Sequence, residues 1–326
     1  MHSIVLQHGD ALDCYDSWDK PVVIVSDGPY GVSGYAGDLH RAEGLSEWYE
    51  PHIEAWAKAC SPLTTLWFWN TEIGWAEVHP VLKKHGWVYR SCNIWDKGLS
   101  HVAGNTNSKT LRRFPVATEV CAHYVRRPKF ILGSDDGVSA QDWLRSEWKR
   151  TGLPFSMANA ACGVKNAATR KYLTSDYMWY FPPPNVFEKL VIFANEHGET
   201  EGCPYFAVNG SVLSGSQWDQ LRGKFYCPIG LTNVWRTPAV RGSERVKLHG
   251  RAIHSCQKPL SLMKRIIKCS SDEGDIIWEP FGGLCSASIA ACNIGRKAFA
   301  AEINNEVYNR AMDRINRDVC VLSGSV

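Results

Sequence analysis

The segment from residue 21 to residue 31 constrains the fold of this chain more than any other. Residues 21–25 read Pro-Val-Val-Ile-Val, and residues 26–31 read Ser-Asp-Gly-Pro-Tyr-Gly. A short apolar run that is rich in β-branched residues is typical of a strand buried on both faces of a parallel sheet. We therefore expect an interior strand of a parallel sheet here, with residues 26–31 leaving its carboxyl end.

Those residues bring chemical groups to the carboxyl edge of the predicted sheet, which is where ligands bind in open α/β sheets. Gly28 and Pro29 shape the backbone at this point. Asp27 offers a hydrogen-bond acceptor, and Tyr30 offers a flat stacking surface. This combination suits a planar substrate with an exocyclic amino group, such as a nucleobase.

Strand and helix patterns alternate at both ends of the chain. Apolar runs predict strands at residues 4–6, 22–25, 63–69, 87–95, 118–125, 275–278 and 297–301. Helical spacing predicts helices at residues 46–61, 73–85, 259–269, 286–293 and 305–319. This order favours an α/β fold, a three-layer, doubly wound and mostly parallel sheet.

The middle of the chain has a different composition. The segment 131–230 is richer in Gly, Pro and Ser, and we predict that it is an inserted recognition region between segments 1–130 and 231–326. Within it, residues 141–150 and 159–173 look like two helices in a helix-turn-helix layout. The second of these carries side chains that read purines in the major groove, Lys165, Asn166, Arg170 and Lys171. A purely structural helix pair is the alternative.

Composition limits the class of protein without fixing it. The 326 residues are 44% hydrophobic and 21% charged, as in ordinary globular proteins, and the net charge of +3 permits a polyanionic partner without requiring one. None of the twelve cysteines forms a C-x-x-C pair, so we expect no metal site. The sequence shows neither a signal peptide nor an apolar stretch of about 18 residues, which predicts an intracellular protein without a membrane partner.

A second pocket is indicated near the C-terminus. Residues 275–283 read as a strand that enters a glycine turn, and Glu302 follows Gly282 by 20 residues. This is the spacing of the acidic residue that accepts ribose hydroxyls in dinucleotide-type units. Because the full G-x-G-x-x-G pattern is absent, an adenosine ligand without phosphates, such as S-adenosylmethionine, fits better than a dinucleotide. Asp10 ends the first strand at the same edge, although turn carboxylates are common there.

Several segments together resemble the amino-directed DNA methyltransferases of the β class. Residues 26–30 resemble their catalytic D/S/N-P-P-Y motif, residues 279–283 resemble their D-P-F-x-G cofactor motif, and residues 254–260 resemble their H-x-x-Q-K-P-L element. Asp10 and Glu302 fall where that family places its other acidic cofactor contacts. The resemblance implies a Rossmann-like methyltransferase fold, with a catalytic half at 1–130, a target-recognition region at 131–230 and a cofactor-binding half at 231–326.

The resemblance also implies roles for the residues of the catalytic motif. Asp27 and the carbonyl of Gly28 would accept hydrogen bonds from the amino group of a flipped base, and Tyr30 would stack on that base. Pro29 completes the motif. Two departures stand out: Gly28 replaces a proline, and Leu284-Cys285-Ser286 replaces the usual S-G-T and leaves Ser286 as a candidate helix N-cap.

For the cofactor, S-adenosylmethionine, the resemblance assigns Glu302 to the ribose and Asp10 to the adenine side. Lys258 is placed near the methionine carboxylate, with a solvated charge at a helix start as the alternative. The further cofactor candidates are Ala11, Glu279, Phe281, Gly282, Gly283 and Asn304. The loop of residues 32–45 is a candidate gate over the flipped base. A basic cluster suited to phosphate contact consists of Lys109, Arg112 and Arg113.

The predicted function is site-specific methylation of double-stranded DNA, in restriction-modification or epigenetic marking. Asp27 favours adenine N6, while Ser26 keeps cytosine N4 open. The alternatives are an impaired enzyme that only binds DNA and a methyltransferase that acts on RNA. A nicotinamide dehydrogenase is disfavoured by the missing third glycine. We expect a cytoplasmic, nucleoid-associated protein of a prokaryote or phage, with a restriction endonuclease partner and a homodimer left open.

Overall fold

The computed structural model describes residues 4–33, 38–102, 110–130, 137–199, 204–248, 251–252 and 257–319. The chain divides into two compact units. The first consists of residues 1–126 and 223–326, and the second consists of residues 127–222. Each unit is described here by itself.

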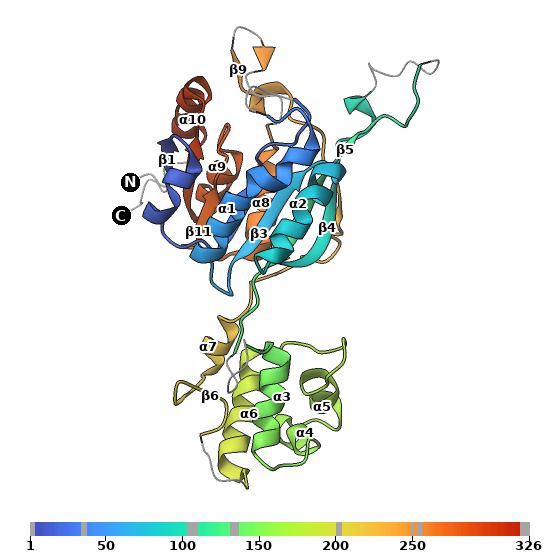
Figure 1. Ribbon diagram of the computed structural model, residues 1–326, viewed down its shortest axis with the longest axis vertical. Coiled ribbons are helices and arrows are strands. Elements are labelled where there is room, and N and C mark those ends of the chain that lie inside the picture. Colours follow the sequence, from blue (N-terminus) through green and yellow to red (C-terminus); the bar gives the residue numbers. More distant parts are fainter. Residues whose placement is uncertain are drawn as a thin grey trace. The chain divides into compact units, whose positions relative to one another are not determined.

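The first unit is built on an eight-stranded sheet with the strand order β1-β12-β11-β2-β3-β5-β4-β8 (Figure 1). Of these strands, β5 alone runs antiparallel to both of its neighbours. The other neighbouring pairs are parallel, so the predicted doubly wound, mostly parallel sheet is confirmed. The strands are β1 (Ile4–His8), β2 (Val23–Ser26), β3 (Thr65–Asn70), β4 (Val88–Asp96), β5 (Thr118–Val125), β8 (Val234–Arg236), β11 (Ile276–Glu279) and β12 (Lys297–Glu302).

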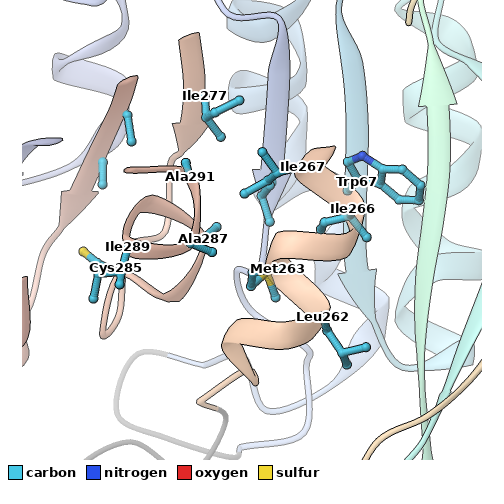
Figure 2. Packing of buried hydrophobic residues seen from close by; sticks show 14 of the residues in the cluster. Trp67, Leu262, Met263, Ile266, Ile267, Ile277, Cys285, Ala287, Ile289 and Ala291 are labelled. Atoms are coloured by element: carbon cyan, nitrogen blue, oxygen red, sulfur yellow. The ribbon is translucent and has the colours of Figure 1, made fainter. Parts of the chain in front are cut away.

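Helices cover both faces of this sheet. The helices α1 (Leu45–Ala59) and α2 (Glu72–Lys84) pack on one face. The helices α8 (Leu260–Ser270), α9 (Ser286–Cys292) and α10 (Asn305–Asp318) pack on the other, where Figure 2 shows Met263 and Ile266 of α8 among the buried side chains. A two-stranded ribbon of β9 (Lys247–Leu248) and β10 (Arg251–Ala252) lies outside the sheet.

The alternation of side chains along β2 explains why its sequence is apolar throughout. Val23 and Val25 belong to the core that α8 and α9 cover, whereas Ile24 belongs to the core beneath α1 and α2. Successive side chains of a strand point to opposite faces, so a strand covered on both sides needs apolar residues at every position. Because helices cover both faces of the sheet, a ligand can reach the strands at their carboxyl ends, where the loops leave the sheet.

The second unit is mainly helical and has a core of its own. Its elements are α3 (Ala140–Arg150), α4 (Met157–Cys162), α5 (Ala167–Tyr172), α6 (Pro184–His197), α7 (Gly215–Asp219) and the hairpin of β6 (Ala207–Val208) and β7 (Ser211–Val212). Trp218 lies at the centre of this core, stacked on Phe187 at 4.4 Å and on Phe181 at 4.3 Å between ring centroids.

The prediction of a single helix over 159–173 was wrong. Gly163 takes a left-handed conformation, with φ +67°, and ends α4 before α5 begins at Ala167. The helix α6 was missed, although Pro184 at its start and the buried Phe187, Leu190, Val191 and Ala194 have helical spacing. The Gly, Pro and Ser content of segment 131–230 hid the start of this helix.

The boundaries of the second unit differ from the predicted insert, 131–230. Residues 223–230 pack with the sheet: the ring of Phe225 stacks on that of His123 at 5.2 Å, and the Tyr226 N–H donates to the Cys269 carbonyl at 2.7 Å. At the other end, Phe130 stacks on Trp143 at 4.3 Å and belongs to the helical core. The Gly, Pro and Ser content shows only that the composition changes near these positions, whereas the long-range contacts set the boundaries of the units.

No helix in the described part of the chain combines the length and the apolar character that crossing a bilayer requires.

Candidate active site

Two loops that leave the sheet side by side form the centre of the site. The strands β2 and β11 are parallel neighbours, with Ile24 opposite Trp278, so residues 27–31 and 280–283 leave the same edge. A Cβ placed on Gly28 would lie 2.7 Å from Cδ2 of Phe281 and 2.6 Å from Oη of Tyr49. The catalytic-type loop and the cofactor-type loop are therefore in direct contact, and only glycine fits at position 28.

Asp27 is held by two side chains. The Lys258 Nζ lies 2.6 Å from Oδ1 and 2.9 Å from Oδ2 of Asp27, and the Tyr30 hydroxyl donates to Oδ1 at 2.9 Å. The Lys258 side chain is 1% exposed and that of Asp27 is 17% exposed. The ion pair is thus buried on the lysine side and reaches solvent on the aspartate side.

Two further charges complete this cluster, and neither was identified in the sequence. Glu119, at the start of β5, has Oε2 3.3 Å from Lys258 Nζ and 3.2 Å from the Tyr30 hydroxyl. Its Oε1 pairs with Lys97, which directly follows β4. Burial alone would raise the pKa of Glu119, but the ammonium groups of Lys258 and Lys97 outweigh it and hold that pKa below its usual value. Glu119 is therefore a carboxylate at neutral pH.

The backbone of the catalytic-type loop is fixed by polar side chains. Asp38 accepts hydrogen bonds from the N–H groups of Tyr30, Gly31 and Val32, at 2.9, 2.8 and 3.1 Å. The Pro29 carbonyl accepts from Asn70 Nδ2 at 3.0 Å and from the Tyr49 hydroxyl at 3.1 Å. The Gly28 carbonyl accepts no hydrogen bond from the described residues. Asp38 belongs to the predicted gating loop, of which residues 34–37 lie outside the described residues.

Glu302 sits at the end of β12, next to the glycine turn. Its Oε2 accepts from the Gly283 N–H at 2.8 Å and its Oε1 from the Asn304 N–H at 2.8 Å. Burial raises the pKa of Glu302 above its ordinary value. A Cβ on Gly282 would lie 2.9 Å from the Ala301 carbonyl oxygen, so this turn also requires glycine. Across the sheet edge, the Gly9 N–H donates to the Glu302 carbonyl at 3.1 Å, which places Asp10 beside the same turn.

The remaining residues assigned to the cofactor have structural partners. Asp10 Oδ1 accepts from the Leu12 N–H at 2.9 Å, and Ala11 is buried beneath α1. Glu279 caps the start of α9, accepting from the Ala287 N–H at 2.9 Å and the Ser288 N–H at 2.7 Å. The Asn304 side chain caps α10. These contacts leave their predicted cofactor roles as predictions.

Two interpretations from the sequence need correction. Lys258 is 2% exposed, so the alternative of a solvated charge is wrong. Ser286 does not cap α9: the N-cap position is Cys285, which has a φ of +56°, and Ser286 Oγ instead accepts from Arg314 Nη1 at 2.9 Å. The buried carboxylate of Glu279 takes the capping role, which local sequence does not reveal.

The candidate DNA-contacting residues divide between the two units, and most of them are exposed. Arg112 and Arg113 lie in the first unit, in the segment before β5. In the second unit, Lys165 lies in the turn between α4 and α5, and the others lie at or in α5, Asn166, Arg170 and Lys171. Lys109 and residues 254–256 of the H-x-x-Q-K-P-L element lie outside the described residues. Within the described residues, no group of three or more His, Cys, Asp or Glu side chains is arranged to hold a metal.

Comparison with protein families gives one match over most of the chain. The family model of the N6 and N4 DNA methylases matches residues 22–313. The chain belongs to this family. The predicted resemblance to amino-directed DNA methyltransferases, which rested on motifs at the two ends of the chain, is confirmed, and the matched span also includes the middle.

Curated relatives match the chain over shorter stretches. DNA adenine methyltransferase YhdJ of Escherichia coli K12 is 38% identical over 84 residues, 26% of this chain and 27% of that protein. Type II methyltransferase M.HindIII of Haemophilus influenzae is 35% identical over 71 residues, 22% of this chain and 23% of that protein. The matched stretches thus span about a quarter of the length of each relative.

Solved structures share the fold at low sequence identity. The cytosine-N4-specific PvuII DNA methyltransferase has a TM-score of 0.54 at 11% identity and covers 100% of this chain and 90% of its own. TTHA0409 of Thermus thermophilus has a TM-score of 0.52 at 13% identity, covering 97% and 96%. M1.HpyAVI, solved in complex with S-adenosylmethionine, has a TM-score of 0.51 at 16% identity, covering 95% and 99%. These likenesses show that the chain shares the fold of these structures.

Proposed function

We propose that this DNA methylase transfers a methyl group from S-adenosylmethionine to the exocyclic amino group of a base in double-stranded DNA. The observation that supports this most is the direct contact between Gly28 and Phe281. It joins the loop that carries the substrate acceptors to the turn that borders the cofactor side. Membership of the DNA methylase family supports the same reaction.

The hydrogen-bond acceptors at the glycine turn fit an adenosine ligand. Glu302 uses one acceptor position on each oxygen for backbone N–H groups, and a carboxylate has about four such positions, so two remain for ribose hydroxyls. A Cβ on Gly9 would meet no atom within 4 Å, so this side of the turn is open. Glu302, Asp10 and Phe281 are the residues that would hold S-adenosylmethionine. When bound, it supplies a methyl group on a sulfonium, which is an excellent leaving group.

The catalytic-type loop would activate the amino nitrogen. The lone pair of that nitrogen is delocalised into the base ring, which makes it a poor nucleophile. Hydrogen bonds from both amino protons to Asp27 and to the Gly28 carbonyl would pull the nitrogen towards a tetrahedral, more reactive state. The fixed backbone around Pro29 and Tyr30 holds both acceptors in place, so that alignment contributes a large share of the rate.

The amino group of a paired base donates a Watson–Crick hydrogen bond and its ring is stacked, so we propose that the substrate base is flipped out of the duplex. Phe114 supports this step, because its side chain is 95% exposed and it directly follows Arg112 and Arg113. An apolar ring that follows two arginines can enter the stack while the arginines hold phosphates. Tyr30 would stack on the flipped base, with its hydroxyl anchored on Asp27.

We propose that the second unit selects the DNA sequence that is methylated. The polar side chains at the start and end of α5 have the chemistry for base and phosphate contact, and the nearby Tyr177 and Tyr180 are 95% and 61% exposed. Adenine N6 is favoured over cytosine N4 by the carboxylate at position 27, and YhdJ is named as an adenine methyltransferase. A role in restriction-modification agrees with the type II methyltransferase M.HindIII, and would bring a restriction endonuclease as partner.

The cellular setting follows from the proposed substrate. An enzyme that marks DNA works where that DNA is, and the two curated relatives described above are bacterial. We propose that the protein acts on the nucleoid or on phage DNA in the cytoplasm of a prokaryotic cell. A homodimer stays open as the oligomeric state.

Transfer of tritiated methyl groups to duplex DNA tests the proposal. The wild-type protein is expected to label the duplex, and Asp27→Ala is expected to abolish labelling while S-adenosylmethionine binding persists. The matched control, Asp16→Ala, changes an exposed aspartate of the same unit and should label normally. A gel shift on DNA without any labelling by the wild type would instead indicate an impaired enzyme that only binds DNA, and labelling of RNA alone would indicate the other alternative.

A further inference from the structure

Lys258 is buried next to Asp27, and the proposed methyl transfer does not by itself require a lysine at this position. Its ammonium group is bound to Asp27 and Glu119 and lies 5.1 Å from the centre of the Tyr30 ring and 5.4 Å from that of Trp69. We propose that Lys258 is a positioning residue, which together with Glu119 orients the Asp27 carboxylate and balances its charge for the amino group. This inference rests on the proposed methyl transfer.

The hydrogen bonds on Asp27 leave one acceptor position for the substrate. Oδ1 accepts from both Lys258 and Tyr30, and Oδ2 accepts from Lys258. Since a carboxylate has about four acceptor positions, the remaining one is on Oδ2. With the Gly28 carbonyl, the loop then presents two acceptors for the two protons of an amino group. Lys258 thus decides which oxygen of Asp27 faces the base.

The same contacts argue against a role for Lys258 on the cofactor. An ammonium group has three N–H donors, and three carboxylate oxygens lie within 3.3 Å of this one. Its side chain is 1% exposed and is enclosed by the rings of Tyr30 and Trp69. An ammonium so confined is already paired with the carboxylates of Asp27 and Glu119, which disfavours a role on the carboxylate of the methionine moiety.

Glu119 is needed because Lys258 alone would weaken Asp27 as an acceptor. A buried ammonium is unfavourable unless it is paired, and a partner shared between two carboxylates binds each of them less tightly. Lys97 pairs with the other oxygen of Glu119, so the cluster holds two positive and two negative charges. This balance keeps Lys258 from fully neutralising the charge of Asp27.

The test is steady-state methyl transfer by Lys258→Met and Glu119→Gln as a function of pH. In Lys258→Met the Asp27 carboxylate loses its cationic partner. The acid limb of the kcat profile should therefore move to higher pH, and kcat should fall about 100-fold. In Glu119→Gln the whole ammonium charge falls on Asp27, so the acid limb should move to lower pH and kcat should fall about 10-fold. The Kd for S-adenosylmethionine should stay within about 3-fold of the wild type in both variants.

The opposite shifts of the two limbs are what a merely structural role would not produce. Lys268→Met changes an exposed lysine on α8, the helix that begins just after Lys258; this variant is the control and should behave as wild type. A loss of S-adenosylmethionine affinity with kcat unchanged would overturn the inference in favour of a cofactor role for Lys258, and unshifted limbs would overturn it as well. If Lys258→Met does not fold, the shift of the acid limb in Glu119→Gln still tests the inference. Absence of methyl transfer by the wild type would instead contradict the proposed function.

Discussion

At the scale of the residue, single atoms decide where the site forms. Gly28 has room for a hydrogen and nothing more, because Phe281 and Tyr49 close the space that a side chain would fill. The glycine that departs from the family pattern is therefore a consequence of how closely the two loops approach. Its carbonyl keeps the acceptor that a proline would have supplied. The departure from proline removes no chemical group that the reaction needs.

Gly28→Ala should destabilise the protein by about 1–3 kcal/mol, because its Cβ would overlap Phe281 and Tyr49 and force the loops apart. Urea unfolding measures this loss, and kcat of methyl transfer should fall with it. Gly44→Ala is the control, since its Cβ would meet only Leu39 at an ordinary 3.7 Å. Equal stability of the two variants would contradict the described contact.

At the scale of the element, a carboxylate at the end of a strand caps a helix. Glu279 ends β11 and turns back to the first N–H groups of α9, whose N-cap residue provides no side-chain bond. The helix α9 is only seven residues long and buried, so its orphan donors need such a partner. Burial raises the pKa of Glu279 to about 7, despite the hydrogen bonds that lower it.

This raised pKa makes stability depend on pH. The folded chain holds the Glu279 proton more tightly than the unfolded chain, in which the ordinary value is 4.5. That contribution is fully present below about pH 4.5 and is lost as the pH rises through about 7. From pH 4.5 to 8, the wild type should lose up to about 3 kcal/mol of unfolding free energy relative to Glu279→Gln. Parallel profiles would refute this, and Glu273→Gln, at an exposed site, should follow the wild type.

At the scale of the whole molecule, the sequence predicted the sheet far better than the charges around it. The apolar runs and the glycine turns are local patterns, so Asp27, Phe281 and Glu302 could be assigned to one edge. Glu119, Lys97 and Asp38 were missed because no local pattern separates a buried charge from a solvated one. The partner of Asp27, Lys258, lies 231 residues away, and only the folded chain brings them together.

The structure of the second unit was the hardest part to predict from the sequence. Its helices α4 and α5 are six residues each, too short for periodicity to separate them, and its tryptophan-rich core is made by contacts between distant segments. The basic residues at α5 were nevertheless visible as a cluster. Their role in DNA binding stays a prediction.

Replacing Lys165, Arg170 and Lys171 together by alanine should raise the KM for duplex DNA about 10-fold or more, because each lost contact removes favourable interaction with the duplex. The Kd for S-adenosylmethionine should not change, since these residues belong to the other unit. Lys189→Ala, an exposed lysine on α6, is the control. An unchanged KM for DNA would exclude α5 from target binding.

The most direct test of the account is to identify the methylated atom. Duplex DNA that has been incubated with the wild-type protein and labelled S-adenosylmethionine is digested to nucleosides, which are then separated and counted. The account predicts label in N6-methyladenine or N4-methylcytosine, with adenine favoured, because Asp27 and the Gly28 carbonyl are placed to bind an amino group. Label on a ring carbon, as in 5-methylcytosine, or no labelled nucleoside at all, would contradict it.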